Sequence, residues 1–127
     1  MKLSVTKEFE FCAAHYLPGH ELCGRMHGHN YRVLVTFEGG ASQDQDMVVD
    51  FKQIKKVIQP IINHLDHTLL NELNAAVLPN FDFALLAIPT AENIAKVIFH
   101  SIPELAGVLL TEVIVYETPT CSARYGL

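Results

Sequence analysis

The sequence predicts an α+β fold: a four-stranded antiparallel sheet with two helices on one face. Segments 3–15 and 27–37 alternate apolar and polar residues with the period of two that is typical of half-buried strands. Segment 108–116 is strongly β-branched, which also favours a strand. Between the second and third of these segments, apolar residues recur twice at helical spacing. This order predicts helices layered on a sheet, and we expect residues 1–127 to form one domain.

A loop joins the first two strands. Residues 16–24 contain one proline and two glycines, which favour irregular structure over a continuing strand. After the second strand, the glycines and polar residues at 39–46 predict a turn. We expect residues 47–49 to return as a short extended segment.

The first helix has a predicted start and a predicted interruption. Asp50 followed by Gln53 matches a capping box, and the apolar helical spacing then continues to Leu65. Pro60 lies inside this pattern, where a proline costs about 3 kcal/mol and removes a backbone hydrogen bond. We therefore expect a kink, or a new helix start, near Gln59.

The second half of the chain continues the alternation of elements. Residues 65–71 read as a turn and residues 72–89 as a long packed loop. Thr90 caps a second helix that ends before Pro103, and residues 121–125 form a short last strand. Four strands leave two open edges, which proteins usually cover or pair, so we expect a homo-oligomer.

Composition restricts the classes of function. Half of the 127 residues are apolar and 18% are charged, which is ordinary for a globular protein. The net charge is −5 and no basic cluster is present, which argues against nucleic-acid binding. Arg25, Arg32 and Arg124 are candidates for binding a phosphorylated small substrate. No apolar stretch is long enough to span a membrane or act as a secretory signal, so we expect no membrane partner and a cytoplasmic location.

Three histidines form the candidate metal site. His27 and His29 are two apart on a predicted strand and therefore project from the same face. His15 ends the preceding strand on its core-facing side, so pairing of the two strands brings the three imidazoles together. Three nitrogen donors with one open position are typical of catalytic zinc.

The three cysteines do not form a disulfide framework, and no CxxC pair is present. Cys23 lies four residues before His27. It is either a fourth metal ligand or a general base beside the metal, and the spacing does not decide between these roles. Cys12 is expected to be a packing residue, and Cys121 is expected to have no partner. Three further histidines are interpreted as surface or satisfied residues: His20, His64 and His100.

Two carboxylates are placed where they can serve a reaction. Asp66 directly precedes His67, and an aspartate that orients an imidazole can tune it for proton transfer. The alternative is that the pair only caps a helix end. Glu117 shares strand parity with Val113 and Val115, so its carboxylate should point to the apolar side, where it needs a partner. Two parallel hydrogen bonds from a guanidine-like edge would satisfy it.

Five motifs occur together and in order: FCAAHYL, CGRMHGHNY, LDHTLLN, PTAEN and YETPT. With them, the chain resembles the 6-pyruvoyl-tetrahydropterin synthase family over nearly its whole length. The narrow spacing of Cys23 and His27 is similar to the bacterial 6-carboxytetrahydropterin synthase branch, which acts in queuosine biosynthesis. Residues 72–89 are longer than the equivalent loop expected for the family.

The resemblance implies a tunnelling fold whose trimers close into a β-barrel and often stack in pairs. It also implies a Zn²⁺ cofactor held by the three histidines of the candidate site, with Cys23 as the catalytic base. Asp66 and His67 would be relay partners of the cysteine, contributed by a neighbouring subunit, and Glu117 would anchor the pterin ring. Glu92, in PTAEN, is interpreted as a favourable charge at a helix start rather than a ligand.

The implied reaction is that of a zinc-dependent lyase. It converts 7,8-dihydroneopterin triphosphate to 6-carboxy-5,6,7,8-tetrahydropterin and releases triphosphate and acetaldehyde. One alternative is elimination of triphosphate that gives the 6-pyruvoyl product, or a related cleavage of the pterin side chain. The alternative of another class is a non-catalytic assembly protein stabilised by zinc.

Overall fold

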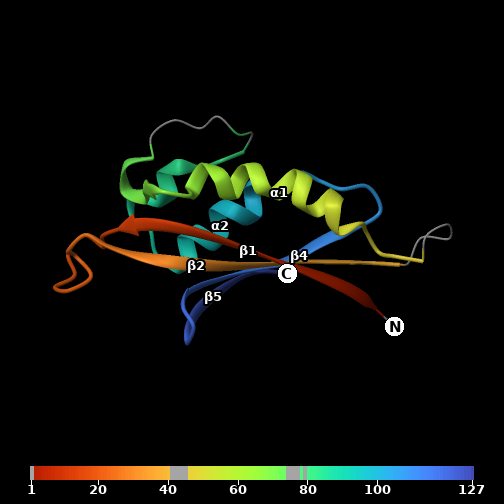
Figure 1. Cartoon of the computed structure of the whole chain (residues 1–127), viewed down its shortest axis with the longest axis horizontal. Coiled ribbons are helices and arrows are strands. Elements are labelled where there is room, and N and C mark those ends of the chain that lie inside the picture. The colour runs from red at the N-terminus through yellow and green to blue at the C-terminus, as the bar shows by residue number, and fades with distance from the viewer. Residues whose placement is uncertain (1, 41–45, 74–77, 79) are drawn as a thin grey trace.

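The computed structural model describes residues 2–40, 46–73, 78 and 80–127. The strands are β1 (Leu3–His15), β2 (His27–Gly39), β3 (Thr68–Leu69), β4 (Leu109–Thr118) and β5 (Cys121–Gly126). The helices are α1 (Phe51–Leu65) and α2 (Ala91–Ser101), with the short 3₁₀ helices η1 (Leu70–Glu72) and η2 (Phe83–Ala87). Both α-helices lie on one side of the sheet, which confirms the predicted α+β class (Figure 1). None of the described helices has the length and apolar character needed to cross a membrane.

Among the described residues the sheet has five strands rather than the predicted four, in the order β3-β1-β2-β4-β5. The pairs β1–β2, β2–β4 and β4–β5 are antiparallel, as expected. The additional strand, β3, pairs in parallel with β1 at Ala13–Thr68 and Ala14–Leu69, so the sheet is mixed. Two residues are too few to show the alternation from which a strand is recognised in a sequence, and this segment was therefore expected to be a turn.

The core fills the space between one face of the sheet and the two helices. The alternation expected for β1 and β2 matches their burial: every second side chain toward the end of β1 and along β2 is buried. Their partners on α1 and α2 are isoleucines and small residues at helical spacing. Fully buried members include Tyr31, Val33, Val35, Ile54, Ile58, Ile94 and Ile98.

The helix α1 differs from its prediction in its N-terminal cap. Asp50 caps it, but its carboxylate accepts the N–H of Lys52 at 2.8 Å instead of the bond expected with Gln53. The helix also continues through Pro60 without a new start. Because Pro60 has no N–H, the carbonyl of Lys56 lacks its helical hydrogen bond. Both residues are exposed, so water can bind this carbonyl while the buried face of the helix stays packed on the core.

Three further expectations concern loops. Residues 46–49 form bends and not a return strand. Residues 41–45 of the expected turn, and 74–77 and 79 of the expected long loop, lie outside the described residues. The described remainder of that loop contains η2, which Asp82 caps by accepting the N–H of Ala84.

Candidate metal centre

The β1–β2 register brings the three predicted histidines together. His15, the last residue of β1, faces His27, the first residue of β2, and His29 faces Ala13 one step further along. His15 is fully buried. Its Nε2 lies 3.1 Å from Nε2 of His27. The two-residue spacing read from the sequence therefore places all three imidazoles at one end of the sheet.

Backbone carbonyls fix the tautomers of two of these histidines. Nδ1 of His27 lies 2.7 Å from the carbonyl oxygen of Arg25, and Nδ1 of His15 lies 2.8 Å from that of Pro89. Because a carbonyl oxygen only accepts hydrogen bonds, each Nδ1 must carry the proton and donate it. Each neutral imidazole then presents an Nε2 lone pair without a proton.

Two such lone pairs at 3.1 Å repel one another unless a cation lies between or beside them. Nitrogens bound to zinc at about 2.0–2.1 Å in tetrahedral geometry lie about 3.3–3.4 Å apart, close to the observed separation. The donation of each Nδ1–H to a carbonyl is the arrangement usual for histidines that bind metals. The residues present therefore fit a zinc ion.

Glu117 completes a cluster of four potential ligands. Its Oε1 lies 3.0 Å from Nε2 of His29 and 3.8 Å from Nε2 of His15. With His27, these residues offer ligand atoms that all lie within 4.8 Å of one another. The β4–β5 register shifts between Tyr116 and Thr118, and this irregularity lies at the glutamate. Bulges of this kind re-aim side chains beside functional sites.

His29 has a suitable state for binding a metal. Burial lowers its pKa, the Glu117 carboxylate opposes this shift, and the charges that His15 and His27 would carry add to it. Its Nε2 is buried and, despite the 3.0 Å approach of Glu117, has no hydrogen bond of acceptable geometry. A buried nitrogen without a hydrogen-bond partner, beside two other imidazole nitrogens, is suited to bind a metal ion.

Tyr31 is a member of the site that was expected only to share a face with the histidines. Its hydroxyl lies 3.2 Å from Nδ1 of His15, and its ring packs edge-on against His15 and His29. Burial and the negative charge of Glu117 raise the pKa of the tyrosine, so it keeps its proton. Its strand parity, the same as that of His29, was the signal that could have assigned it to the site.

Cys23 lies in the Cys23 loop (residues 16–26), which extends past the ends of β1 and β2 (Figure 1). The loop closes where the N–H of Leu17 donates to the carbonyl of Cys23 at 2.6 Å. Gly24 is required there, because a Cβ at this position would lie 2.0 Å from the carbonyl oxygen of His20. The thiol is exposed, and the described donor cluster contains Glu117 in place of Cys23.

Asp66 and His67 lie beside the end of β1. Asp66 accepts the N–H of Cys12 at 2.8 Å through one oxygen, and its other oxygen lies 2.7 Å from Nδ1 of His67. The Cys12 N–H, with His67 in second place, lowers the pKa of the Asp66 carboxyl. His67 has a φ of 58° and an 81% exposed side chain, so it is held in a left-handed conformation and points into solvent. No hydrogen bond or ion pair between described residues joins this pair to Cys23.

Cys12, expected to be a packing residue, is exposed. Its even position in β1 puts it on the face of the sheet that the helices do not cover, as its parity opposite to Phe11 already implied. Its backbone, however, has a role: the N–H binds Asp66, and the carbonyl accepts the N–H of His67 at 2.6 Å.

The remaining candidates lie apart from the cluster. His20 is exposed, Nε2 of His100 lies 2.9 Å from the hydroxyl of Tyr125, and the ring of His64 packs on Phe81. Exposure of Glu92 in the first turn of α2 matches its expected role at a helix start.

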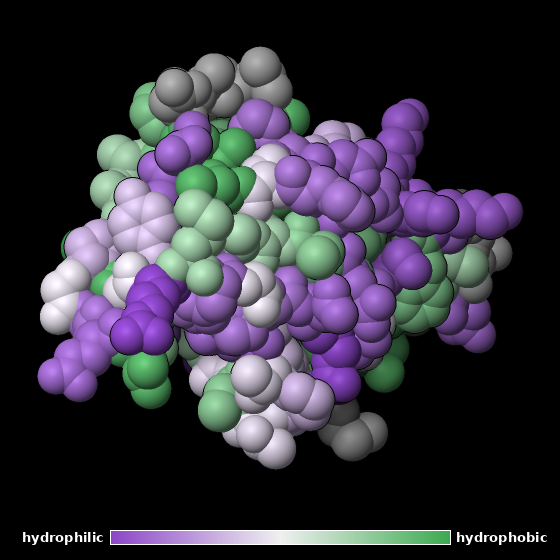
Figure 2. Space-filling view, turned by 60° about the vertical axis from the view of Figure 1, so that its left-hand side comes forward, coloured by the Kyte–Doolittle hydropathy of each residue, from purple (hydrophilic) through white to green (hydrophobic). Residues whose placement is uncertain are grey.

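Two of the three candidate arginines are already engaged. Arg32 lies 3.3 Å from a Glu8 oxygen and stacks on Tyr116, and Arg124 pairs with Glu112. Arg25 is exposed, two residues before His27. Hydrophilic residues cover much of the face that Figure 2 presents, which is turned toward the Cys23 loop end.

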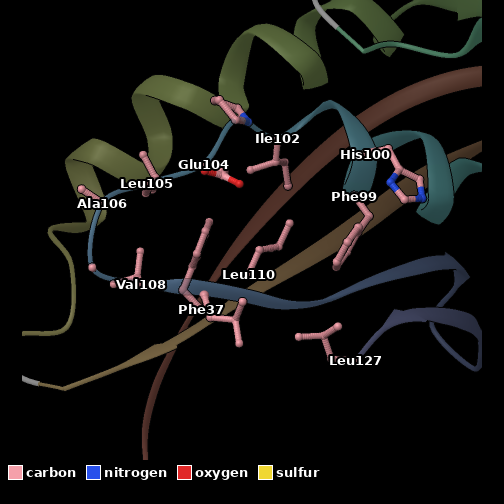
Figure 3. Close-up of a pocket in the computed structure, with 13 residues that line it drawn as sticks. Phe37, Phe99, His100, Ile102, Glu104, Leu105, Ala106, Val108, Leu110 and Leu127 are labelled. Carbon is pink, nitrogen blue, oxygen red and sulfur yellow. The ribbon is translucent and has the colours of Figure 1, made fainter.

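A large cavity lies away from the cluster, toward the opposite end of β2. It has a volume of about 830 Å³ between the end of α2, the following loop and β4 (Figure 3). Its lining is mainly apolar, with His100 and Glu104 as its ionisable side chains. These two groups do not supply the donors for a metal-dependent reaction, so the histidine cluster remains the candidate site.

Comparisons with known proteins agree with this architecture. The chain matches the 6-pyruvoyl tetrahydropterin synthase family over residues 4–126. A Synechocystis protein named 6-carboxy-5,6,7,8-tetrahydropterin synthase is 39% identical over 127 residues, which cover 95% of this chain and 91% of the relative. A Bacillus subtilis protein of the same name is 31% identical over 131 residues, covering 95% and 83%.

The fold is also that of a solved structure. Caenorhabditis elegans 6-pyruvoyl tetrahydropterin synthase superposes with a TM-score of 0.82 at 23% identity, covering 100% of this chain and 96% of that one. The relatives confirm the predicted resemblance, and with it the expectation of an enzyme of this lyase family. This chain belongs to the 6-pyruvoyl tetrahydropterin synthase family.

Proposed function

We propose that this protein is a zinc-dependent 6-carboxytetrahydropterin synthase of queuosine biosynthesis. Its substrate is 7,8-dihydroneopterin triphosphate. With one water consumed, the products are 6-carboxy-5,6,7,8-tetrahydropterin, triphosphate and acetaldehyde. The observation that carries the metal dependence is the 3.1 Å approach of the Nε2 atoms of His15 and His27, whose Nδ1 atoms both face backbone carbonyl oxygens. The names of the relatives support the pterin product.

The three histidines and Cys23 have different roles in the proposed reaction. When bound to His15, His27 and His29, zinc would act as a Lewis acid toward the side-chain hydroxyls of the pterin and make the adjacent C–H more acidic. The Cys23 thiolate removes that proton as the general base. Its exposure at the end of the sheet, outside the donor cluster, supports a role as base over a role as ligand.

The proton relay is assigned to a second subunit. Asp66 holds His67 at 2.7 Å and can orient its imidazole to return protons to the reacting side chain. Within one subunit the His67 side chain is largely exposed and is not bonded to Cys23. We therefore place Asp66 and His67 of one subunit against Cys23 of another, in a homo-oligomer built by pairing open sheet edges.

This arrangement predicts complementation between impaired variants. Cys23→Ala and His67→Ala proteins should each have a strongly reduced turnover, whereas co-refolded mixtures should form some sites with an intact cysteine and an intact histidine. Pterin turnover of the mixture should then rise well above that of either variant alone. Turnover that stays at the level of the separate variants would place all catalytic groups in one subunit.

We assign the pterin ring to a negatively charged side chain and the triphosphate to a positively charged one. Glu117 accepts two hydrogen bonds from the N3–H and the 2-amino group of the ring. Arg25, exposed beside the metal ligands, is a candidate contact for the triphosphate. Arg25→Ala should raise KM for the triphosphate substrate while leaving the metal content unchanged.

Product identification tests the proposed function directly. The metal-loaded protein is incubated with 7,8-dihydroneopterin triphosphate, and the pterin products are identified by mass spectrometry together with an acetaldehyde assay. The proposal requires 6-carboxy-5,6,7,8-tetrahydropterin and acetaldehyde in equal amounts. A 6-pyruvoyl product without acetaldehyde would assign the earlier elimination, and no turnover of any pterin would favour the non-catalytic assembly protein.

A further inference from the structure

Asn71 makes an unusual contact with the main chain directly after the metal ligand His15. Its side-chain oxygen accepts the N–H of Tyr16 at 3.0 Å, and its side-chain N–H₂ donates to the carbonyl of Tyr16 at 2.9 Å. One carboxamide therefore satisfies both backbone groups of a single residue, as a neighbouring strand would.

The reason for this contact lies in the geometry of β3. This strand pairs with β1 only at Ala13 and Ala14, and the chain then turns away into η1, whose first residue, Leu70, is fully buried. The backbone consequently cannot continue the ladder to Tyr16. The carboxamide of Asn71, which has the same donor and acceptor as a peptide group, takes the place of the next backbone partner.

Tyr16 connects two parts of the proposed catalytic site. It follows His15 directly, and it precedes Leu17, whose N–H closes the Cys23 loop by donating to the carbonyl of Cys23 at 2.6 Å. A chain of hydrogen bonds and one peptide link thus runs from Asn71 to the backbone of the catalytic cysteine.

The same segment, residues 66–71, is bound to β1 at its other end. Asp66 accepts the Cys12 N–H there. The segment that carries the relay pair and the loop that carries the base of the same subunit are therefore both fixed to one strand end. Asn71 makes the side-chain contact to Tyr16 at the end of segment 66–71 that lies nearer to the Cys23 loop.

We infer that Asn71 is a positioning residue that, through Tyr16, holds His15 and the Cys23 loop in the geometry that the reaction requires. It touches neither metal nor substrate. The expected effect of Asn71 on kcat rests on the proposed function. Its effects on amide exchange and on the reactivity of Cys23 can be measured without any pterin.

Two substitutions separate the two hydrogen bonds. Asn71→Asp has the same shape and keeps an acceptor for the Tyr16 N–H, but it sets a carboxylate oxygen against the Tyr16 carbonyl. Asn71→Ala removes both bonds. The matched control is Asn63→Asp, which makes the same chemical change at an exposed residue whose side-chain oxygen, among the described residues, accepts only from Gln59 on α1.

The first measurement is amide exchange of the metal-loaded protein. The Tyr16 amide should be protected in the wild type, and loss of its bond in Asn71→Ala should accelerate its exchange by about tenfold. Fast exchange of this amide in the wild type would overturn the inference, even if neither Asn71 variant folds.

The second measurement follows the reactivity of Cys23 in a protein whose other thiols are removed by Cys12→Ser and Cys121→Ser. The pH profile of alkylation by iodoacetamide should change in both Asn71 variants and not in Asn63→Asp. A profile within twofold of the parent at every pH, in a folded variant, would reduce Asn71 to a purely structural contact and overturn the proposal.

The third measurement is pterin turnover. Misplacement of a catalytic group by about 1 Å costs about 10²-fold, so kcat should fall by about 10- to 100-fold in both variants. KM and the metal content per chain should stay within twofold of the parent protein. An unchanged kcat in a folded variant would contradict the inference. If the parent itself turns over no pterin, the proposed function fails, while exchange and alkylation still decide the role of Asn71.

Discussion

Glu117 provides the sharpest test of the proposed site, because its position allows it either to bind the metal or to bind the pterin. Its Oε1 lies 3.0 Å from Nε2 of His29, so it is near enough to be a fourth metal ligand. Its place at the end of β4, with a side chain that is 27% exposed, also lets it reach a pterin in solvent-accessible space. The substitution Glu117→Gln keeps the shape and removes the charge.

If Glu117 anchors the pterin, the substitution removes one of two charge-assisted hydrogen bonds. In its place the side-chain NH₂ of the glutamine faces an N–H of the pterin, and both groups are donors. Such bonds contribute about 1.5–3 kcal/mol each, which corresponds to a fall in kcat/KM of about 10- to 150-fold. Zinc should remain, because three imidazoles and a water suffice for a catalytic site. The assays are steady-state kinetics with the pterin triphosphate and metal content by mass spectrometry.

The matched control is Glu112→Gln, an identical change on the same strand whose carboxylate pairs with Arg124 away from the cluster. It should leave kcat/KM within about twofold, as expected for a partly exposed ion pair. Loss of zinc from Glu117→Gln, with the control intact, would refute the reasoning and make the glutamate a ligand.

Three further predictions address the base, the relay and the metal. Cys23→Ala should lower kcat by about 10²–10⁴-fold while one zinc per chain is retained, and loss of the zinc would instead make the cysteine a ligand. The pKa of the Asp66 carboxyl, measured by NMR titration, should lie below its usual value of about 3.9. The stabilisation that its charge gives the folded protein is therefore fully present above a pH of about 3.9 and is lost as the pH falls through the lower pKa of the folded state. His67→Asn should raise this midpoint but leave it below the usual value, since the Cys12 N–H remains, and a wild-type midpoint at or above 3.9 contradicts the geometry. Chelation of the metal should abolish turnover and leave the far-UV circular dichroism nearly unchanged, because most of the buried core residues are apolar side chains outside the cluster. Cooperative unfolding would contradict this.

The sequence predicted those features that follow from periodicity. Alternation along β1 and β2 was enough to place His15, His27 and His29 on the core-facing side, and the antiparallel register does bring them together. Capping of the second helix by Thr90 was likewise readable, and its hydroxyl accepts the N–H of Asn93 at 3.1 Å.

Features that depend on one or two residues, or on the packing of distant segments, were not readable. The strand β3 is two residues long and is defined only by its partner in β1. Pro60 predicts a kink or a new start, and the structure shows one helix with buried isoleucines on both sides of the proline and no new start. The approach of Glu117 to His29 requires the register of three strands and an irregularity at the glutamate, none of which the strand parity specifies.

The outer shell of the metal centre shows why ligands can be read from a sequence more easily than their surroundings. His15 and His27 are oriented by the carbonyl oxygens of Pro89 and Arg25, which any residue type would supply at those positions. What matters is the path of the backbone, and in the Cys23 loop that path depends on Gly24, where no Cβ fits. Changes of loop conformation should therefore alter the tautomers of the ligands, and with them the affinity for metal, even where no ligand is substituted.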